Sequence, residues 1–187
     1  RAGLFAVDAG GVLTVPARLH TRSVTQQEQG MPMRTEAEFL AEYAKSHRNK
    51  TNQIVHIFCV PLIFFATLGL FWLLPVGQWV PGVPEAYQSW VNLASLGILP
   101  VMAFYVRLSL WSTLTGLAWL IVSFAGIVLL EQAGLPLLPI FAGIWVAAWA
   151  VQFWGHKVEG AKPSFSDDLV FLLVGPLFVQ QKFQRGL

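Results

Sequence analysis

Four long apolar stretches, separated by short turn-forming segments, dominate the chain after its first fifty residues. They cover residues 54–74, 90–106, 113–130 and 136–155. A helix that crosses a membrane needs about 20 apolar residues, with a range of about 17–25, so each stretch is long enough to span. Breakers such as Pro75, Gly77 and Gly134 lie between them. The pattern predicts an all-α, polytopic membrane protein with a four-transmembrane-helix bundle.

A shorter amphipathic segment precedes the first apolar stretch. Thr35 and Glu38 have the spacing of a capping box, which starts a helix. Apolar residues then recur at the helical spacing, at Phe39, Leu40 and Tyr43. We therefore expect an N-terminal amphipathic helix over residues 35–46.

A last apolar run, residues 168–179, is too short to cross a bilayer and contains Gly175-Pro176, which we expect to interrupt it. It predicts a C-terminal re-entrant or interfacial helix. Residues 1–33 have mixed polarity and no apolar core of the kind found in secretory signals. We expect them to form a disordered N-terminal extension, and residues 34–187 to form a single helical membrane domain.

The basic residues test this topology, because Lys and Arg concentrate in cytoplasmic loops. Of the 12, seven precede the first apolar stretch, Arg107 lies between the second and third, and four follow the fourth. The other two loops contain only acidic charge, at Glu85 and Glu131. Both termini should therefore face the cytoplasm, with four crossings between them. The membrane would be the bacterial inner membrane, or the endoplasmic reticulum in a eukaryote.

Composition agrees with a bilayer as the surrounding medium. The chain is 55% hydrophobic and 12% charged, whereas soluble domains are about 25% charged. The net charge of +2 is too small to indicate nucleic-acid binding, and the single Cys59 excludes an internal disulfide. We expect most tryptophans to face lipid or form interfacial belts: Trp72, Trp79, Trp90, Trp111, Trp145 and Trp149.

Three histidines lie where polar sequence meets apolar sequence, all on the predicted cytoplasmic side. His47 and His56 lead into the first apolar stretch, and His156 ends the fourth. Because nine residues on one helix place two side chains about half a turn out of phase, His47 and His56 converge only if the helix breaks between them. Asn49 and Asn52 favour such a break, since Asn is common at turns and helix N-caps.

Further polar residues accompany the histidines. Gln152, His156 and Glu159 share one helical face, and Asn52 lies one turn before His56. Imidazole binds Zn, Cu, Fe and Ni, and a site of three histidines without thiolate is compatible with non-haem Fe(II). Glu159 could bind the metal or orient a histidine, and we favour the second role.

Three groups of residues then form a combined motif: Tyr43-x-x-Ser46-His47-x-Asn49-x-x-Asn52-x-x-x-His56, Val60-Pro61-Leu62, and Gln152-Phe153-x-Gly155-His156-x-x-Glu159-x-x-x-Pro163 with Gly175-Pro176-Leu177-Phe178. Over residues 36–182 the chain resembles a small membrane family, long classed as a domain of unknown function. The family includes the fungal 2-hydroxy fatty acid dioxygenase of phytosphingosine breakdown. Departures from its usual pattern are Cys59 for Gly, Val158 for Phe and Ser164 for Ala.

The resemblance implies an Fe(II)-dependent α-oxidation, in which dioxygen converts a 2-hydroxy fatty acid to a fatty acid one carbon shorter. It implies His47, His56 and His156 as metal ligands and catalytic residues together with Glu159, supported by the cofactor-site residues Asn49, Asn52 and Gln152. The lipid bilayer would hold the substrate chain. Alternatives are a membrane metalloprotein that acts on another lipid, a haem protein with His56 and His156 as axial ligands, or a non-catalytic membrane scaffold.

Overall fold

The computed structural model describes residues 6–7, 13–14, 34–166 and 170–185. The chain divides into two compact units, Arg1–Arg34 and Thr35–Leu187. In the first, the short strands β1 (Ala6–Val7) and β2 (Leu13–Thr14) pair antiparallel. The rest of residues 1–33, for which we predicted disorder, lies outside the described residues.

The described part of the second unit is helical. Its elements are α1 (Glu36–Lys45), α2 (Lys50–Trp72), α3 (Val76–Trp79), α4 (Glu85–Gln88), α5 (Leu93–Leu108), α6 (Leu110–Gln132), α7 (Leu137–Glu159), the 3₁₀ helix η2 (Ser164–Ser166) and α8 (Phe171–Arg185). The predicted capping box is present, with Thr35 and Glu38 each accepting from the other's backbone N–H. The four predicted apolar stretches correspond to α2, α5, α6 and α7.

Three segments are long and apolar enough to cross a membrane: Lys50–Trp79, Leu110–Gln132 and Leu137–Glu159. The first of them combines α2 and α3. The remaining apolar helix, α5, has 16 residues. Large apolar side chains on α6 are exposed, among them Leu117, Ile121 and Val122, as expected for a helix in contact with lipid tails. The protein is therefore an integral membrane protein by the length and composition of its helices.

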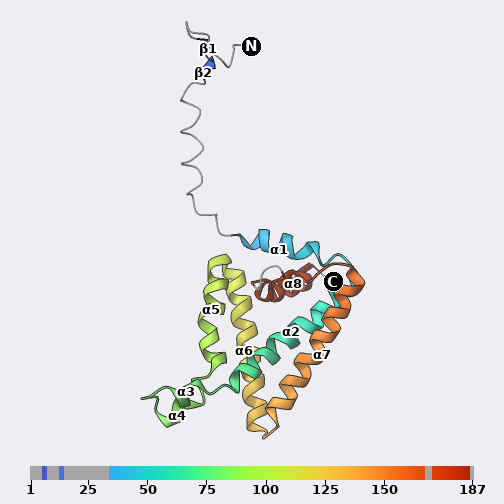
Figure 1. Cartoon of the computed structure of the whole chain (residues 1–187). Coiled ribbons are helices and arrows are strands. Elements are labelled where there is room, and N and C mark those ends of the chain that lie inside the picture. Colours follow the sequence, from blue (N-terminus) through green and yellow to red (C-terminus); the bar gives the residue numbers. More distant parts are fainter. Residues whose placement is uncertain (1–5, 8–12, 15–33, 167–169, 186–187) are drawn as a thin grey trace. The chain divides into compact units, whose positions relative to one another are not determined.

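The short helices lie at opposite ends of the long ones (Figure 1). α1 and α8 pack together at one end, through an apolar cluster that includes Phe39, Phe171 and Phe178. α3 and α4 lie at the other end, beyond the last turn of α2. A second cluster, centred on Ala66, Leu120 and Phe141, joins α2, α6 and α7 within the bundle.

The expected interruption at Gly175-Pro176 was wrong, because α8 runs without a break from Phe171 to Arg185 and contains Pro176. Proline removes one helical hydrogen bond, so tertiary packing has to compensate. Pro176 is fully buried. A Cβ on Gly175 would meet Val60 of α2 at 3.1 Å, so the glycine permits close packing of α8 on α2.

Candidate metal centre

The chain reverses between α1 and α2, which brings His47 opposite His56. α1 ends at Lys45 and α2 begins at Lys50, with Asn49 as its N-cap; the Asn49 side chain accepts a hydrogen bond from Thr51 N at 2.8 Å. The break that the nine-residue spacing requires is therefore present. The side chain of Gln53 secures the loop by donating to the His47 carbonyl at 2.7 Å.

His47, His56 and His156 meet in the interior of the helical unit. One nitrogen from each ring lies within 4.8 Å of the others, and the side chains are 2%, 0% and 4% exposed. The ring of His47 stacks on Tyr43, with centroids 4.0 Å apart and an interplanar angle of 4°. Three imidazoles from the α1–α2 loop, α2 and α7 thus form one buried cluster.

Backbone carbonyls fix the tautomers of two of these rings. Nδ1 of His47 lies 2.6 Å from the Tyr43 carbonyl oxygen, and Nδ1 of His56 lies 2.9 Å from that of Asn52. A carbonyl oxygen only accepts, so each Nδ1 carries the proton and donates it. Each Nε2 is then an unprotonated acceptor with a free lone pair.

Those two Nε2 atoms are only 2.9 Å apart. With both Nδ1 atoms protonated, neutral rings have no hydrogen to place between the two lone pairs, and burial disfavours an added charge on either ring. The Nδ1 of His156 is also buried, with no hydrogen-bond partner in the described part of the chain. Converging, unpaired nitrogen donors fit a divalent transition-metal ion, which prefers neutral imidazole.

The protonation of His47 supports this assignment. Burial lowers the pKa of its imidazole to about 3, and repulsion from His56 lowers it as well, against the opposing effect of the Tyr43 carbonyl. His47 is therefore neutral at physiological pH, the form in which imidazole binds a metal. Burial also raises the pKa of the Tyr43 phenol, so that its ring remains uncharged against His47.

Glu159 holds the histidine loop to α7. Its two carboxylate oxygens accept from the backbone N–H groups of Arg48 (2.9 Å) and Asn49 (2.8 Å), and from Asn52 Nδ2 at 3.2 Å. Asn52 also donates to the Ser46 carbonyl at 3.1 Å. The carboxylate is thus hydrogen-bonded to the loop backbone. The group of possible metal ligands consists of His47, His56 and His156 and does not include Glu159.

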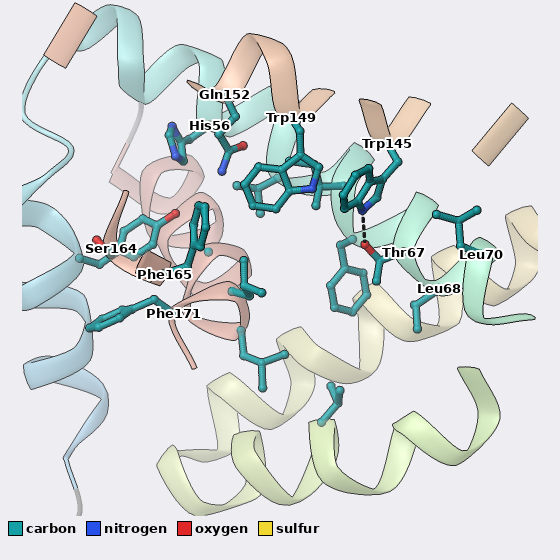
Figure 2. Close-up of a pocket in the computed structure, with 18 of the residues that line it drawn as sticks. His56, Thr67, Leu68, Leu70, Trp145, Trp149, Gln152, Ser164, Phe165 and Phe171 are labelled. Carbon is teal, nitrogen blue, oxygen red and sulfur yellow. Dashed lines mark hydrogen bonds between the residues drawn. The ribbon is translucent and has the colours of Figure 1, made fainter. Parts of the chain in front are cut away.

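A cavity of about 470 Å³ leads away from the histidines. Among its lining residues are Gln152, Trp149 and Trp145 of α7, labelled in Figure 2. His156 also lines it, and its helical spacing places it on the same face of α7. The Gln152 Oε1 and Trp149 Nε1 atoms are buried and lack a hydrogen-bond partner within the described chain. Asn49 and Asn52 do not line this cavity. Of the three residues predicted at the cofactor site, Gln152 lines the cavity, whereas Asn49 caps α2 and the Asn52 carbonyl accepts from His56 Nδ1.

The sequence pattern did not identify several residues of the site. Trp145 and Trp149, predicted to face lipid, line the cavity, and Trp72 is buried at 6% exposure. Trp79, Trp90 and Trp111 are exposed, in agreement with the prediction. Lys182 on α8 donates to Gln53 Oε1 at 2.8 Å and so supports the His47 loop. Only the arrangement of helices reveals these roles.

One of the three departures from the family pattern, Ser164, lies at the site. The Ser164 hydroxyl is 2.7 Å from that of Ser46, next to His47, and Ser164 lines the cavity. Cys59 is buried in an apolar cluster with Val55, Ile63 and Ala148. The histidine geometry favours a shared metal ion over the haem hypothesis, because the centroid of the His47 ring lies 4.2 and 5.0 Å from those of His56 and His156, beside the space that a porphyrin would need.

Comparison with known proteins identifies the family of the chain. Residues 33–187 match the family described as 2-hydroxy-palmitic acid dioxygenase Mpo1-like, and the chain belongs to this family. The match contains all three clustered histidines and Glu159. No curated protein and no solved structure matches the chain.

Proposed function

From this family membership and the histidine cluster, we propose that the protein is an Fe(II)-dependent dioxygenase that performs α-oxidation of 2-hydroxy fatty acids. The observation that carries the proposal is the pair of unprotonated Nε2 atoms, 2.9 Å apart and buried at the end of a largely apolar cavity. A metal centre at one end of an acyl-sized cavity suits an amphiphile with a polar head and an apolar tail.

The reaction balances without an outside reductant. The bond between the carboxyl carbon and the carbon that bears the hydroxyl breaks, the first leaves as carbon dioxide, and the second becomes the new carboxyl group. Dioxygen takes up all the electrons that these two carbons lose, and water is the remaining product. Iron(II) held by the three histidines supplies the activation of dioxygen that such a reaction needs.

The protein's own groups have separate tasks in this proposal. The Tyr43 and Asn52 carbonyls hold His47 and His56 in the tautomer that presents Nε2. Glu159 positions the loop that carries His47. The amide of Gln152, close to the histidines on the cavity wall, binds the polar head of the substrate. The apolar walls surround the tail and exclude water.

We further propose that α5 is the fourth crossing, which places both termini in the cytoplasm. Its 16 residues span about 24 Å, short of the roughly 30 Å hydrocarbon layer, so the bilayer has to thin locally or the flanking residues have to extend the crossing. The charge distribution supports this count, since the segment between α2 and α5 and the segment from the last turn of α6 to α7 contain no Lys or Arg, only Glu85 and Glu131.

The main rival is a membrane metalloprotein that acts on another lipid, because the same cavity and cluster would serve a different polar head. A scaffold without catalysis is a weaker candidate, since it gives no reason for buried, unpaired nitrogen donors. Reaction products, rather than metal content, separate the first rival from the proposal.

The test is metal content and oxygen uptake of detergent-purified protein, loaded anaerobically with Fe(II), in wild type and in His47→Ala, His56→Ala and His156→Ala. The fourth histidine provides a matched control, His20→Ala. We expect near-stoichiometric iron and turnover of 2-hydroxy acids in wild type and control, with both at background in the three variants. Folded wild-type protein that binds no iron would refute the proposal. Turnover retained by the His156→Ala variant would also refute it.

A further inference from the structure

Two contacts between α2 and α7, which we call the two levels, lie along the cavity. The first is the histidine cluster, where His56 meets His156 with ring centroids 4.9 Å apart. At the second, the indole Nε1 of Trp145 on α7 donates to Thr67 Oγ1 on α2 at 3.2 Å, the dashed line in Figure 2. Both partners of the second contact line the cavity.

The two levels are equally spaced along both helices. Thr67 follows His56 by eleven residues, and Trp145 precedes His156 by eleven residues. At 1.5 Å per residue the two levels are about 16 Å apart. Because the helices run antiparallel, the Thr67–Trp145 bridge crosses from one cavity wall to the other at a fixed distance from the metal centre.

The lining between the two levels suits an alkyl chain. Val60, Ile63 and Phe64 of α2 face the cavity here, with Trp149 on the α7 side. Past the bridge the cavity continues, as its lining includes residues further along α2 and on α5: Leu68, Leu70, Phe71, Gly97 and Val101. The bridge therefore joins the two helices part of the way along the cavity, with apolar lining residues on both sides of it.

We propose that the Thr67–Trp145 bridge sets the chain-length preference of the enzyme. This inference rests on the proposed function, because it places the polar head of a 2-hydroxy acid at the histidines. An extended tail of palmitoyl length then reaches the bridge, and a longer tail passes it. Shorter chains fit without disturbing the bridge. Longer chains have to displace the Trp145 indole, which is 37% exposed and has room to move outward.

The experiment compares 2-hydroxy fatty acids shorter than, equal to and longer than 2-hydroxypalmitate. Two readouts are taken for each: kcat/KM with the Fe(II)-loaded enzyme, and competitive occupancy by native mass spectrometry without iron. The variants are Trp145→Ala, which removes both the indole and the hydrogen bond, and Trp145→Phe and Thr67→Val, which keep most of the volume but lose the hydrogen bond. Trp111→Ala on α6, exposed and outside this cavity, is the matched control.

We expect Trp145→Ala to shift both profiles toward longer chains, by up to roughly fourfold in relative affinity for each methylene admitted. Trp145→Phe and Thr67→Val should shift them less in the same direction, and Trp111→Ala not at all. An unchanged profile in folded Trp145→Ala and Trp145→Phe would overturn the inference, as would an equal shift in the control.

The two readouts separate this inference from the proposed function. If the occupancy profile shifts in length but neither wild type nor any variant turns over substrate, the chain-length role of the Thr67–Trp145 bridge is supported and the dioxygenase function is refuted. If all variants turn over substrate with the same length profile, the dioxygenase function is supported and the chain-length role of the bridge is refuted.

Discussion

The helices of the pairs α2–α7 and α5–α6 pack on each other, but the pairs differ in the hydrogen bonding of their buried polar groups. On α6 two buried hydroxyls have partners: Ser112 donates to Glu36 at 2.8 Å, and Thr115 donates to the Trp111 carbonyl at 2.7 Å. On α2 and α7, by contrast, lie all four buried side-chain atoms that lack a partner in the described chain: Asn52 Oδ1, Trp149 Nε1, Gln152 Oε1 and His156 Nδ1.

This difference separates a structural helix pair from a functional one. An unpaired polar group in a low-dielectric interior is costly, so its persistence calls for a ligand or a function. α5 and α6 pack closely where Gly116 faces Tyr105, since a Cβ on Gly116 would collide with the Tyr105 ring. Substitutions in the two pairs should therefore affect different measurements.

The largest effect is expected at the carboxylate that fastens the histidine loop. Glu159→Gln keeps the shape but removes the charge that accepts from the Arg48 and Asn49 backbone. Groups that orient metal ligands typically contribute about 10–100-fold to metal affinity, and we expect a loss of that size in competition with a chelator. Glu131→Gln, whose carboxylate accepts from Trp72 on α2, is the control. Equal losses in both variants would mean that Glu159 has no specific role at the centre.

A smaller effect, on stability instead of metal binding, is expected in the other helix pair. Gly116→Leu forces the Tyr105 ring away from α6, and overpacking of this kind costs about 1–3 kcal/mol in free energy of unfolding. Thermal unfolding should report the loss, while the folded fraction binds metal with normal stoichiometry. Gly143→Leu on α7 is the control, because a Cβ there meets no atom within 4 Å. Loss of metal from folded Gly116→Leu protein would blur the distinction between the pairs.

The smallest effect concerns a single hydrogen bond. The Tyr105 hydroxyl donates to the Leu173 carbonyl of α8 at 2.8 Å. Tyr105→Phe should lower stability by about 1 kcal/mol, measured by the shift of the unfolding midpoint, without changing turnover. If turnover fell while stability did not, α5 would have a role in the reaction that its paired polar groups do not suggest.

The sequence predicted the helices and the three histidines for a simple reason: both signals are local. Apolar length marks the spanning segments, and a histidine beside an apolar stretch is conspicuous. The break between His47 and His56 was predictable too, since the spacing demands it and Asn49 supplies an N-cap.

Features that depend on how distant helices align were not predictable. Trp145 reaches Thr67, and Glu159 reaches the Arg48 backbone, only because of the register between α2 and α7. Pro176 reads as a helix breaker in isolation but lies inside α8, where burial against neighbouring helices compensates for the missing hydrogen bond. Trp72, whose residue type is typical of interfacial belts, packs against Trp90 and Phe124.

The origin of the three ligands in distant parts of the chain has a consequence for biosynthesis. One hundred residues, including the whole α5–α6 hairpin, separate His56 from His156. At about 5–20 residues per second, a ribosome needs roughly 5–20 s to synthesise them. Throughout that interval the nascent chain offers two imidazoles and no closed pocket. Under the proposed function, metal binding at all three histidines is therefore a late event, which begins only when α7 has entered the membrane beside α2.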